Sequence, residues 1–275
     1  MTKYNDSLGD RMKSYEKQPL VQRFDGTTPI IARVDGRAFH TFTKDLNRPY
    51  DIGFLGLMTR VTKELLRETQ AKLAYTQSDE ITLVFEDRDL FMAGRAVKMI
   101  SLIASLATAH FNRYLPQFLP AKDTQSLGPK LVPVFDCRVF TVPNRVEAAN
   151  CLVWRVHDAK RNAIQAVARC VFSTKEIHGK SSKELLDMLK NSPLWNDYCP
   201  SGFKYGRFVQ PCVVARKFKD FEVEHLPPEH DARQNPELVV KRSEMRVIPG
   251  NLAAPSLATG ILEMLETQPT EIAHD

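Results

Sequence analysis

The chain has 275 residues, of which 43% are hydrophobic and 26% are charged. This length and composition are typical of a globular protein with one large core or two smaller ones, and they exclude a collagen-like or disordered chain. Thirty-eight lysines and arginines against 33 aspartates and glutamates leave a net charge of +5, which is compatible with an anionic partner without requiring one.

The cysteines and the apolar segments indicate the compartment. The five cysteines are odd in number, and none forms a C-x-x-C pair or stands at zinc-ligand spacing with a histidine. The N-terminal residues are polar and lack the apolar stretch of a secretory signal. The most apolar stretch, Val97 to Phe111, contains Lys98 and is shorter than the roughly 20 residues that a bilayer requires. We therefore expect a cytoplasmic protein with reduced thiols and no membrane contact.

Strands and helices alternate along the first half of the chain. Apolar, β-branched runs that end at turn residues predict strands, and apolar residues at three-and-four spacing predict helices. The predicted elements are a strand at 29–34, a helix from about Ile52 to Glu68, strands at 73–77 and 81–85, a helix from about Leu90 to Leu115 and a strand at 133–140. This order is the split βαβ, or ferredoxin-like, arrangement of an α+β fold.

The second half of the chain is expected to extend this unit. The same kinds of pattern predict helices from about Val146 to Phe172, from Ser181 to Leu189 and from Leu257 to Leu265, and a strand at 208–214. We expect Ser181 or Ser182 to cap the second of these helices, with Glu184 in its first turn. The polar, acidic C-terminal end is expected to be disordered. The chain therefore divides into a ferredoxin-like unit with its N-terminal segment, residues 1–145, and a helical and β extension packed on it, residues 146–275.

Two acidic segments are expected to meet at one edge of the sheet. Right-handed crossovers place the first and third strands side by side and antiparallel, so that Asp35 and the pair Asp79–Glu80 converge. Carboxylates at such an edge can hold two Mg²⁺ ions, which would position an attacking hydroxyl and a leaving pyrophosphate. Asp-Gly and Ser-Asp are also ordinary turn sequences, and the alternative is a group of solvated acids without a ligand.

Basic residues follow the first acid and recur later in the chain. Arg37, His40 and Lys44 are suited to a triphosphate, because arginine binds phosphate through two donors and lysine binds it as a point charge. His40 has an alternative role, which is packing beside Phe39 and Phe42. Basic residues with interleaved aromatics predict an RNA-backbone surface, or alternatively a solvated face; they are Lys175, His178, Lys180, Lys183, Lys204, Tyr205 and Arg207.

Four segments carry a resemblance to a known family. They are Asp35–His40 (DGRAFH), Gln77–Glu80 (QSDE), Phe135–Phe140 (FDCRVF) and Trp154–Asn162 (WRVHDAKRN). Each is unspecific alone, but all four in this order and spacing resemble the tRNA(His) guanylyltransferase family, most closely its bacterial-type guanylyltransferase-like branch. The resemblance runs from Tyr4 to about Arg207, with a thinner match over 242–249.

This resemblance implies a polymerase-like palm domain and an enzyme that extends tRNA at its 5′ end, in the 3′-to-5′ direction. In the family, ATP adenylylates a 5′-monophosphate, the 3′-hydroxyl of GTP attacks the activated end, and pyrophosphate is removed later. Each step is phosphoryl or nucleotidyl transfer, which two metal ions can assist. The implied partners are tRNA, which the extension 146–275 would contact, ATP and GTP as substrates, two Mg²⁺ ions, and further copies of the chain in a homotetramer.

Carried over by position, the resemblance implies roles for individual residues. Asp35 and Asp79 would be catalytic with Glu80 as a supporting acid, and the metal ions would bind Asp35, Gly36 and Asp79. The nucleotide would contact Asp35, Gly36, Arg37, Ala38, Phe39, His40, Lys44, Arg48, Ser78 and Asp79. The tRNA or its phosphates would contact Arg155, Asp158, Lys160, Asn162, Lys180, Lys204 and Arg207.

One position departs from the eukaryotic pattern. Eukaryotic members carry His-Ile-Asn-Asn where this chain has Lys160-Arg161-Asn162-Ala163, so a lysine replaces a histidine associated with activity. The replacement resembles the branch that repairs 5′-truncated tRNAs by templated addition, and it leaves open whether a non-templated G is added to tRNA(His). Two other functions remain as alternatives: a palm-like nucleotide cyclase that acts on free nucleotides, and a non-catalytic RNA-binding protein.

Overall fold

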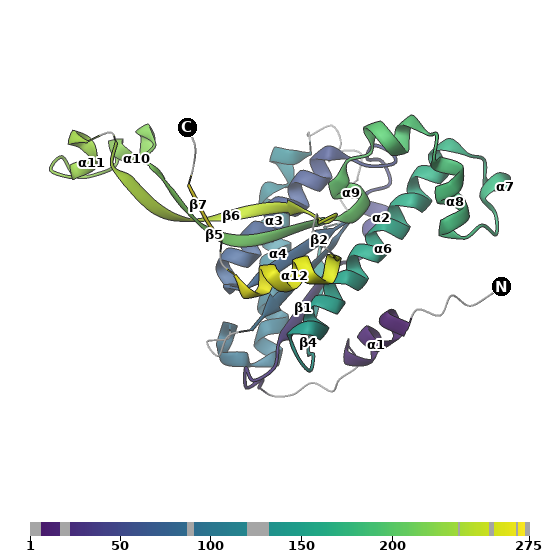
Figure 1. Cartoon of the computed structure of the whole chain (residues 1–275), viewed down its shortest axis with the longest axis horizontal. Coiled ribbons are helices and arrows are strands. Elements are labelled where there is room, and N and C mark those ends of the chain that lie inside the picture. The colour runs from purple at the N-terminus through teal and green to yellow at the C-terminus, as the bar shows by residue number, and fades with distance from the viewer. Residues whose placement is uncertain are drawn as a thin grey trace.

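A mixed sheet with helices on both faces forms the centre of the molecule (Figure 1). The computed structural model describes residues 7–16, 23–86, 91–119, 132–235, 237–252, 256–267 and 269–272. In chain order, the strands are β1 (Ile30–Gly36), β2 (Leu73–Gln77), β3 (Glu80–Phe85), β4 (Phe135–Thr141), β5 (Arg207–Lys217), β6 (Val239–Pro249) and β7 (Thr270–Ile272). Their order in the sheet is β4-β1-β3-β2-β5-β6, and β7 pairs in parallel with β5.

The first four strands form the expected ferredoxin-like core. β1 pairs antiparallel with β3 and β4, and β2 pairs antiparallel with β3. Right-handed crossovers through α3 (Ile52–Thr69) and α4 (Ala96–Phe118) produce this order. α3 begins where the Asp51 carboxylate accepts a hydrogen bond from the Phe54 amide at 2.9 Å, which caps the helix. The prediction of an α+β, ferredoxin-like fold is confirmed.

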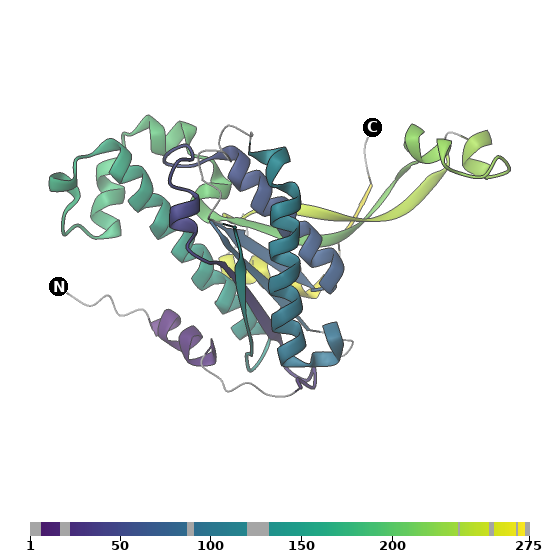
Figure 2. The same cartoon turned by 180° about the vertical axis from the view of Figure 1, so that it is seen from behind.

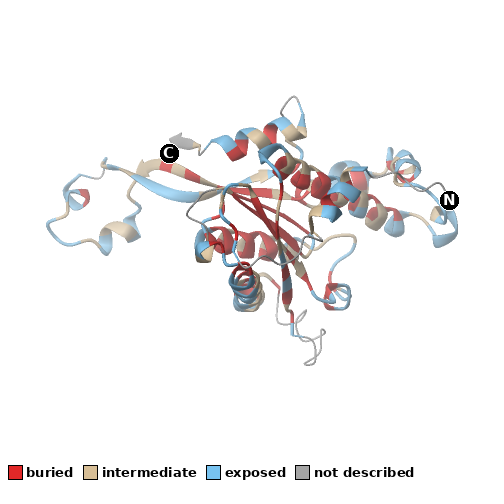
Figure 3. Ribbon diagram, turned by 90° about the horizontal axis from the view of Figure 1, so that it is seen from below, coloured by how far each residue is buried: buried red, intermediate tan, exposed pale blue. Residues whose placement is uncertain are grey.

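Both faces of the sheet are buried, each under different helices (Figure 3). Alternate residues of a strand point to opposite faces. Ala32 and Val34 belong to the core under α3 and α4, whereas Ile31 belongs to the core under α6 (Arg145–Val171) and α12 (Leu257–Glu266). α1 (Ser7–Glu16) covers the lower part of this second face beside α6. By the same alternation, Asp35 points to the α6 side of the sheet.

The chain after α6 forms a helical segment and then a long arm. The short helices are α7 (Thr174–Ile177), α8 (Ser182–Leu189), η2 (Leu194–Tyr198) and α9 (Ser201–Tyr205). Ser181 and Glu184 form a capping box at the start of α8, as the sequence predicts. β5 and β6 then extend from the sheet as a hairpin, with α10 (Asp220–Glu224) and α11 (Asp231–Gln234) at its far end (Figure 2).

The second strand of this arm is the main element that the sequence patterns miss. The strand predicted at 208–214 is β5, which continues to Lys217, but no apolar pattern predicts β6. Most side chains of β6 are exposed and several are charged, so β6 lacks the alternation of a half-buried strand. Because β5 pairs with β2, one sheet crosses the boundary expected at residue 145.

The remaining differences from the predicted elements are shifted ends and further elements that were not predicted, among them α1, the short helix α2 (Phe39–Phe42) and β7. α4 begins at Ala96, after a 3₁₀ turn η1 (Phe91–Gly94), and α2 follows β1. Leu90, where the helix was expected to start, and residues 273–275 at the C-terminal end lie outside the described residues. All five cysteines are free thiols. In the ranges that the structure describes, no helix combines the length and apolarity needed to cross a bilayer.

Candidate functional site

The end of β1 and the start of β3 bring the predicted acids together. Asp35 lies opposite Glu80 in the β1–β3 ladder, and the Gly36 amide donates to the Asp79 carbonyl oxygen at 3.1 Å. Ser78 and Asp79 form the two-residue turn between β2 and β3, where Ser78 adopts a φ of 48°. The prediction that Asp35 and Asp79–Glu80 meet at one edge of the sheet is confirmed.

Asp35 and Asp79 are partly buried acids that repel each other. Burial, and then the charge of Asp136, raises the pKa of Asp35. Burial raises the pKa of Asp79 and repulsion by Asp35 adds to this, against hydrogen bonds from Ser78 and the Asp79 backbone and the charge of His40. Among the described residues, no lysine or arginine forms a hydrogen bond or ion pair with either carboxylate. Arg33, Arg138 and Arg155 act on Asp35 only through their charge. Hard, negatively charged oxygen donors that are not paired with a protein cation fit Mg²⁺.

An aromatic cluster anchors the segment that follows Asp35. The ring of Phe39 is buried and lies 4.9–5.3 Å, centroid to centroid, from the rings of Phe42, Phe111 and Phe135. A Cβ atom on Gly36 would lie 2.4 Å from this ring, so a larger residue would displace the anchor. Phe39 is thus a core residue whose packing holds the backbone of 36–40 against the acidic edge.

The side chains around this anchor remain accessible. Ala38 adopts a left-handed conformation with a φ of 57°, and Arg37, Ala38 and His40 are exposed. The Arg37 amide donates to the Val134 carbonyl oxygen at 2.9 Å, which ties the segment to the chain before β4. The alternative in which His40 packs beside Phe39 and Phe42 is wrong, because the exposed His40 ring hydrogen-bonds the Thr41 hydroxyl instead.

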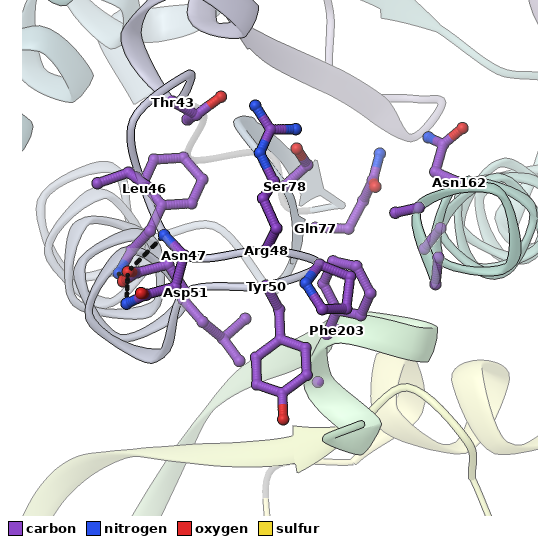
Figure 4. Close-up of a pocket in the computed structure, with 17 residues that line it drawn as sticks. Thr43, Leu46, Asn47, Arg48, Tyr50, Asp51, Gln77, Ser78, Asn162 and Phe203 are labelled. Carbon is purple, nitrogen blue, oxygen red and sulfur yellow. Dashed lines mark hydrogen bonds between the residues drawn. The ribbon is translucent and has the colours of Figure 1, made fainter. Parts of the chain in front are cut away.

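Two adjoining cavities open at this edge of the sheet. The first, about 300 Å³, is lined by Gly36, Ala38, Phe39, His40, Thr43, Ser78 and Asp79. The second, about 220 Å³, lies between the segment 43–55, the end of β2, α6 and α9 (Figure 4). Thr43 and Ser78 line both cavities, so the acidic edge and the second cavity are continuous.

The second cavity contains residues that the sequence analysis missed. Asp51 caps α3 and also binds the Asn47 side-chain amide at 2.8 Å, which fixes the near wall. Gln77, Tyr50 and Phe203 complete the wall with apolar surface and amide groups (Figure 4). The only sequence signal for this cavity was Asp51, a helix-capping residue shortly after Arg48-Pro49. Phe203 gave no signal, because it is distant from these residues in sequence.

Arg48 and Lys44 occupy different positions relative to these cavities. Arg48 lines the second cavity, and its guanidinium lies near Thr43 and Ser78, the two residues that also line the first cavity (Figure 4). It also donates to the Lys44 carbonyl oxygen at 3.2 Å. Lys44 is exposed and is not among the residues that line either cavity.

Glu80 and Arg155 are buried behind the acidic edge. Arg155 Nε lies 2.6 Å from Glu80 Oε1, and Arg155 Nη2 lies 2.8 Å from Asp158 Oδ2. The exposed fractions of the Arg155 and Glu80 side chains are 8% and 6%. Both residues were expected to act directly, Glu80 as an acid of the site and Arg155 on RNA phosphate. Their placement favours an internal ion pair instead.

The other residues expected to contact tRNA lie mainly along α6 and after it. Asn162 is exposed and lines the second cavity, and Lys180 is exposed between α7 and α8. The Lys160 and Lys204 ammonium groups lie 5.9 and 4.8 Å from the ring centres of Tyr205 and Trp195, respectively.

Arg207 is tied into the protein more firmly than these lysines. It donates to the Thr59 hydroxyl at 2.9 Å, and burial lowers its pKa. Asp158 holds both Arg155 and Arg161, at 2.8 and 2.7 Å.

Comparisons with known proteins agree with this geometry. The family model for tRNAHis guanylyltransferase matches residues 9–143. The tRNA(His) guanylyltransferase of Saccharomyces cerevisiae is 27% identical over 202 residues, 68% of this chain and 82% of that protein. A bacterial tRNA(His) guanylyltransferase-like protein solved in complex with ATP is 32% identical, with a TM-score of 0.61 over 74% of this chain and 86% of that chain.

A second solved structure covers nearly the whole chain. A bacterial tRNA(His) guanylyltransferase-like protein in complex with GTP matches with a TM-score of 0.63 and 26% identity, over 95% of this chain and 100% of that chain. The chain therefore belongs to the tRNA(His) guanylyltransferase family of nucleotidyltransferases.

Proposed function

We propose that the protein adds nucleotides from GTP to the 5′ end of tRNA in the 3′-to-5′ direction, after ATP activates the 5′-phosphate, in a Mg²⁺-dependent reaction. Addition of G to tRNA(His) and template-dependent repair of 5′-truncated tRNA are both within this proposal. The observation that carries it is the convergence of Asp35 with Asp79, which lines the first cavity; neither carboxylate forms an ion pair or hydrogen bond with a described lysine or arginine.

The donor set at this edge fits the metal that the family implies. The Asp35 and Asp79 carboxylates and the Gly36 carbonyl oxygen would hold the ions, which supply charge neutralisation for nucleotidyl transfer when bound. Phe39 fixes the backbone at Gly36, and the β1–β3 ladder fixes the separation of the two acids. Arg37 and His40 are exposed beside the first cavity and would bind phosphate oxygens by charge.

The second cavity is suited to the base of a bound nucleotide. It combines aromatic and aliphatic walls with the side-chain amides of Asn47, Gln77 and Asn162. An amide presents both a donor and an acceptor, so these walls can hydrogen-bond either purine. Because Ser78 and Thr43 line both cavities, a nucleotide with its base here would extend its phosphates toward Asp79 and His40.

The tRNA backbone is expected to cross the far side of α6. A groove of about 500 Å³ between α1, α6 and α8 is lined by His157, Lys160, Arg161 and Lys183 together with Ser7, Leu8, Trp154, Ile164, Ser182 and Leu186. Four basic side chains and no acidic one line it, which suits a phosphodiester backbone. Lys180 and Lys204 would extend this surface on either side of it.

The proposed reaction is tested with labelled GTP, ATP, Mg²⁺ and a tRNA that lacks its first nucleotide. We expect label at the 5′ end, dependent on the RNA. A parallel reaction without RNA tests the alternative of a nucleotide cyclase: a cyclic product there, with no labelled tRNA in the first reaction across several tRNAs, would contradict the proposal.

Filling the second cavity is expected to weaken nucleotide binding. Ala166 lines this cavity from α6, so Ala166→Phe should raise KM for ATP and GTP by about tenfold or more, because the added ring occupies the space of the base. Cys170→Phe places the same kind of ring one turn further along α6, at an exposed position, and should leave KM within about twofold of wild type. Equal effects in the two variants would contradict the assignment of this cavity.

Removing an acid of the metal site should stabilise the metal-free protein. Because the pKa values of Asp35 and Asp79 are raised, the folded state binds protons more tightly than the unfolded chain. This contribution to stability is present below the ordinary carboxyl pKa and is lost as pH rises through the raised values. In EDTA at pH 7, Asp35→Asn should therefore melt at or above the wild-type temperature, and the difference should shrink toward pH 4. Mg²⁺ should raise the wild-type Tm more than the variant Tm.

Two broader features of the family resemblance are proposals as well. We expect a homotetramer, which size-exclusion chromatography with light scattering tests, and cytoplasmic localisation, which a fluorescent fusion tests. A monomer at micromolar concentration would contradict the first, and association with membranes would contradict the second.

A further inference from the structure

A chain of buried ion pairs runs behind the acidic edge, on the α6 side of the sheet. Arg155 Nε, from α6, lies 2.6 Å from one Glu80 oxygen, and Arg33 Nε lies 3.9 Å from the other. The main partner of Arg33 is Glu16, which binds its Nη1. The exposed fractions of the Glu80, Arg155 and Arg33 side chains are 6%, 8% and 11%. Burial raises the pKa of Glu80, and the charges of Arg155 and Arg33 oppose this shift. The two arginines therefore oppose the protonation of Glu80 that burial favours.

The same arginines act on Asp35 without touching it. The charges of Arg33, Arg138 and Arg155 each stabilise the Asp35 carboxylate, yet no described arginine forms an ion pair or hydrogen bond with it. Glu80 lies directly opposite Asp35 in the β1–β3 ladder, and paired residues of antiparallel strands point to the same face. Asp35 and Glu80 are thus neighbouring carboxylates near the buried Arg155 guanidinium. Of the two, only Glu80 accepts the hydrogen bond from Arg155 Nε.

We propose that Glu80 is a positioning residue that engages Arg155 and so prevents it from pairing with Asp35. This inference rests on the proposed function, in which the Asp35 carboxylate binds divalent cations. Without the Glu80 charge, the buried Arg155 Nε donor would lose its charged partner, which is costly inside a protein, so the side chain would turn toward a neighbouring carboxylate. Asp158 already binds Arg155 Nη2 at 2.8 Å and Arg161 at 2.7 Å, so Asp35 is the neighbouring acid that the Arg155 Nε donor would take. Glu80 therefore keeps Asp35 open for the metal without ligating it.

The test is a double-mutant cycle that measures binding of Mn²⁺ to the full-length protein by electron paramagnetic resonance of the free ion. Glu80→Gln should weaken Mn²⁺ binding by about tenfold, because Arg155 then competes for Asp35. Arg155→Met should bind Mn²⁺ at least as tightly as wild type, because the competing charge is gone. The double variant Glu80→Gln/Arg155→Met should return to within about twofold of wild type.

A matched control separates this role from general stability. Glu64 is buried on α3, with an exposed side-chain fraction of 8%, and it pairs with Arg60 at 2.7 Å and with Arg67, away from the acidic edge. Glu64→Gln should lower the melting temperature as Glu80→Gln does, with unchanged Mn²⁺ binding. The double variant replaces a buried ion pair with neutral groups, a change that is often tolerated, so it tests the proposal even if Glu80→Gln does not fold.

Three results would overturn the inference. Unchanged Mn²⁺ binding in folded Glu80→Gln would show that Arg155 does not compete for Asp35. A folded double variant that binds more than about tenfold more weakly than wild type would show that Glu80 itself ligates the ion. Weaker binding in Arg155→Met would contradict competition directly. If wild type binds no Mn²⁺, the proposed function fails with the inference, whereas the first two results leave that function standing.

Discussion

Replacing Asp35 or Asp79 by asparagine is expected to lower kcat/KM for nucleotide addition to tRNA by on the order of 10³-fold or more. Both substitutions keep the size of the side chain and remove the charge that would hold a divalent cation. Both residues stand at the end of a strand or in a turn, and neither belongs to a hydrophobic core cluster. The fold should therefore persist, which circular dichroism and thermal melting check.

Asp136 provides a matched control for these two variants. It lies opposite Asp35 on β4, and it is exposed. Asp136→Asn removes one charge next to the same edge, so it should lower the pKa of Asp35 slightly and change kcat/KM by less than about threefold. If Asp35→Asn and Asp136→Asn lose activity equally, the edge acts through its overall charge, and the assignment of Asp35 as a ligand is wrong.

Phe39→Ala is expected to destabilise the protein by about 3–5 kcal/mol and also to reduce nucleotide binding. The ring is 2% exposed, and it contacts four other phenylalanines as well as supporting Gly36. Its loss leaves a cavity beneath the segment that lines the acidic edge. Denaturant titration measures the stability change, and KM for ATP at a temperature where the variant is folded measures the effect on the site.

Phe42→Ala separates the effect of Phe39→Ala on stability from its effect on nucleotide binding. Phe42 is 1% exposed and belongs to the same aromatic cluster, but the Cβ position of Gly36 faces Phe39. We expect a similar loss of stability with a smaller rise in KM. If KM rises in proportion to the loss of stability in both variants, Phe39 has no particular role in supporting the segment 36–40.

The acidic edge could be predicted from the sequence because it depends on topology alone. Once four strands and two helices are recognised, right-handed crossovers place the end of β1 beside the start of β3. Asp35 and Asp79–Glu80 are then expected to meet without any knowledge of side-chain packing, whereas the register that pairs Asp35 with Glu80 comes from the structure. The exposure of His40 was not accessible in this way, because it depends on the short helix α2, which directs both Phe39 and Phe42 into the core and leaves His40 on the outside.

The features that the sequence did not reveal depend on tertiary contacts. Arg155 follows Trp154 on a helix with a polar face, and nothing in that pattern shows that the guanidinium reaches Glu80 on the face of the sheet that α6 covers. Phe203 reaches the second cavity from a five-residue helix that has no strong periodic signal. β6 is held by its backbone pairing with β5 over 11 residues and has few buried side chains, so propensity patterns do not detect it.

The most direct measurement concerns which end of the tRNA receives the nucleotide. The substrate is a tRNA truncated by one 5′ nucleotide that carries a 5′-monophosphate and a 3′ end blocked by periodate oxidation, incubated with labelled GTP, ATP and Mg²⁺. The account predicts that label is incorporated in spite of the blocked 3′ end. It also predicts that no label is incorporated when phosphatase has removed the 5′-monophosphate from the tRNA before the reaction. Incorporation that requires an open 3′ end, or that is indifferent to the 5′-phosphate, would contradict it.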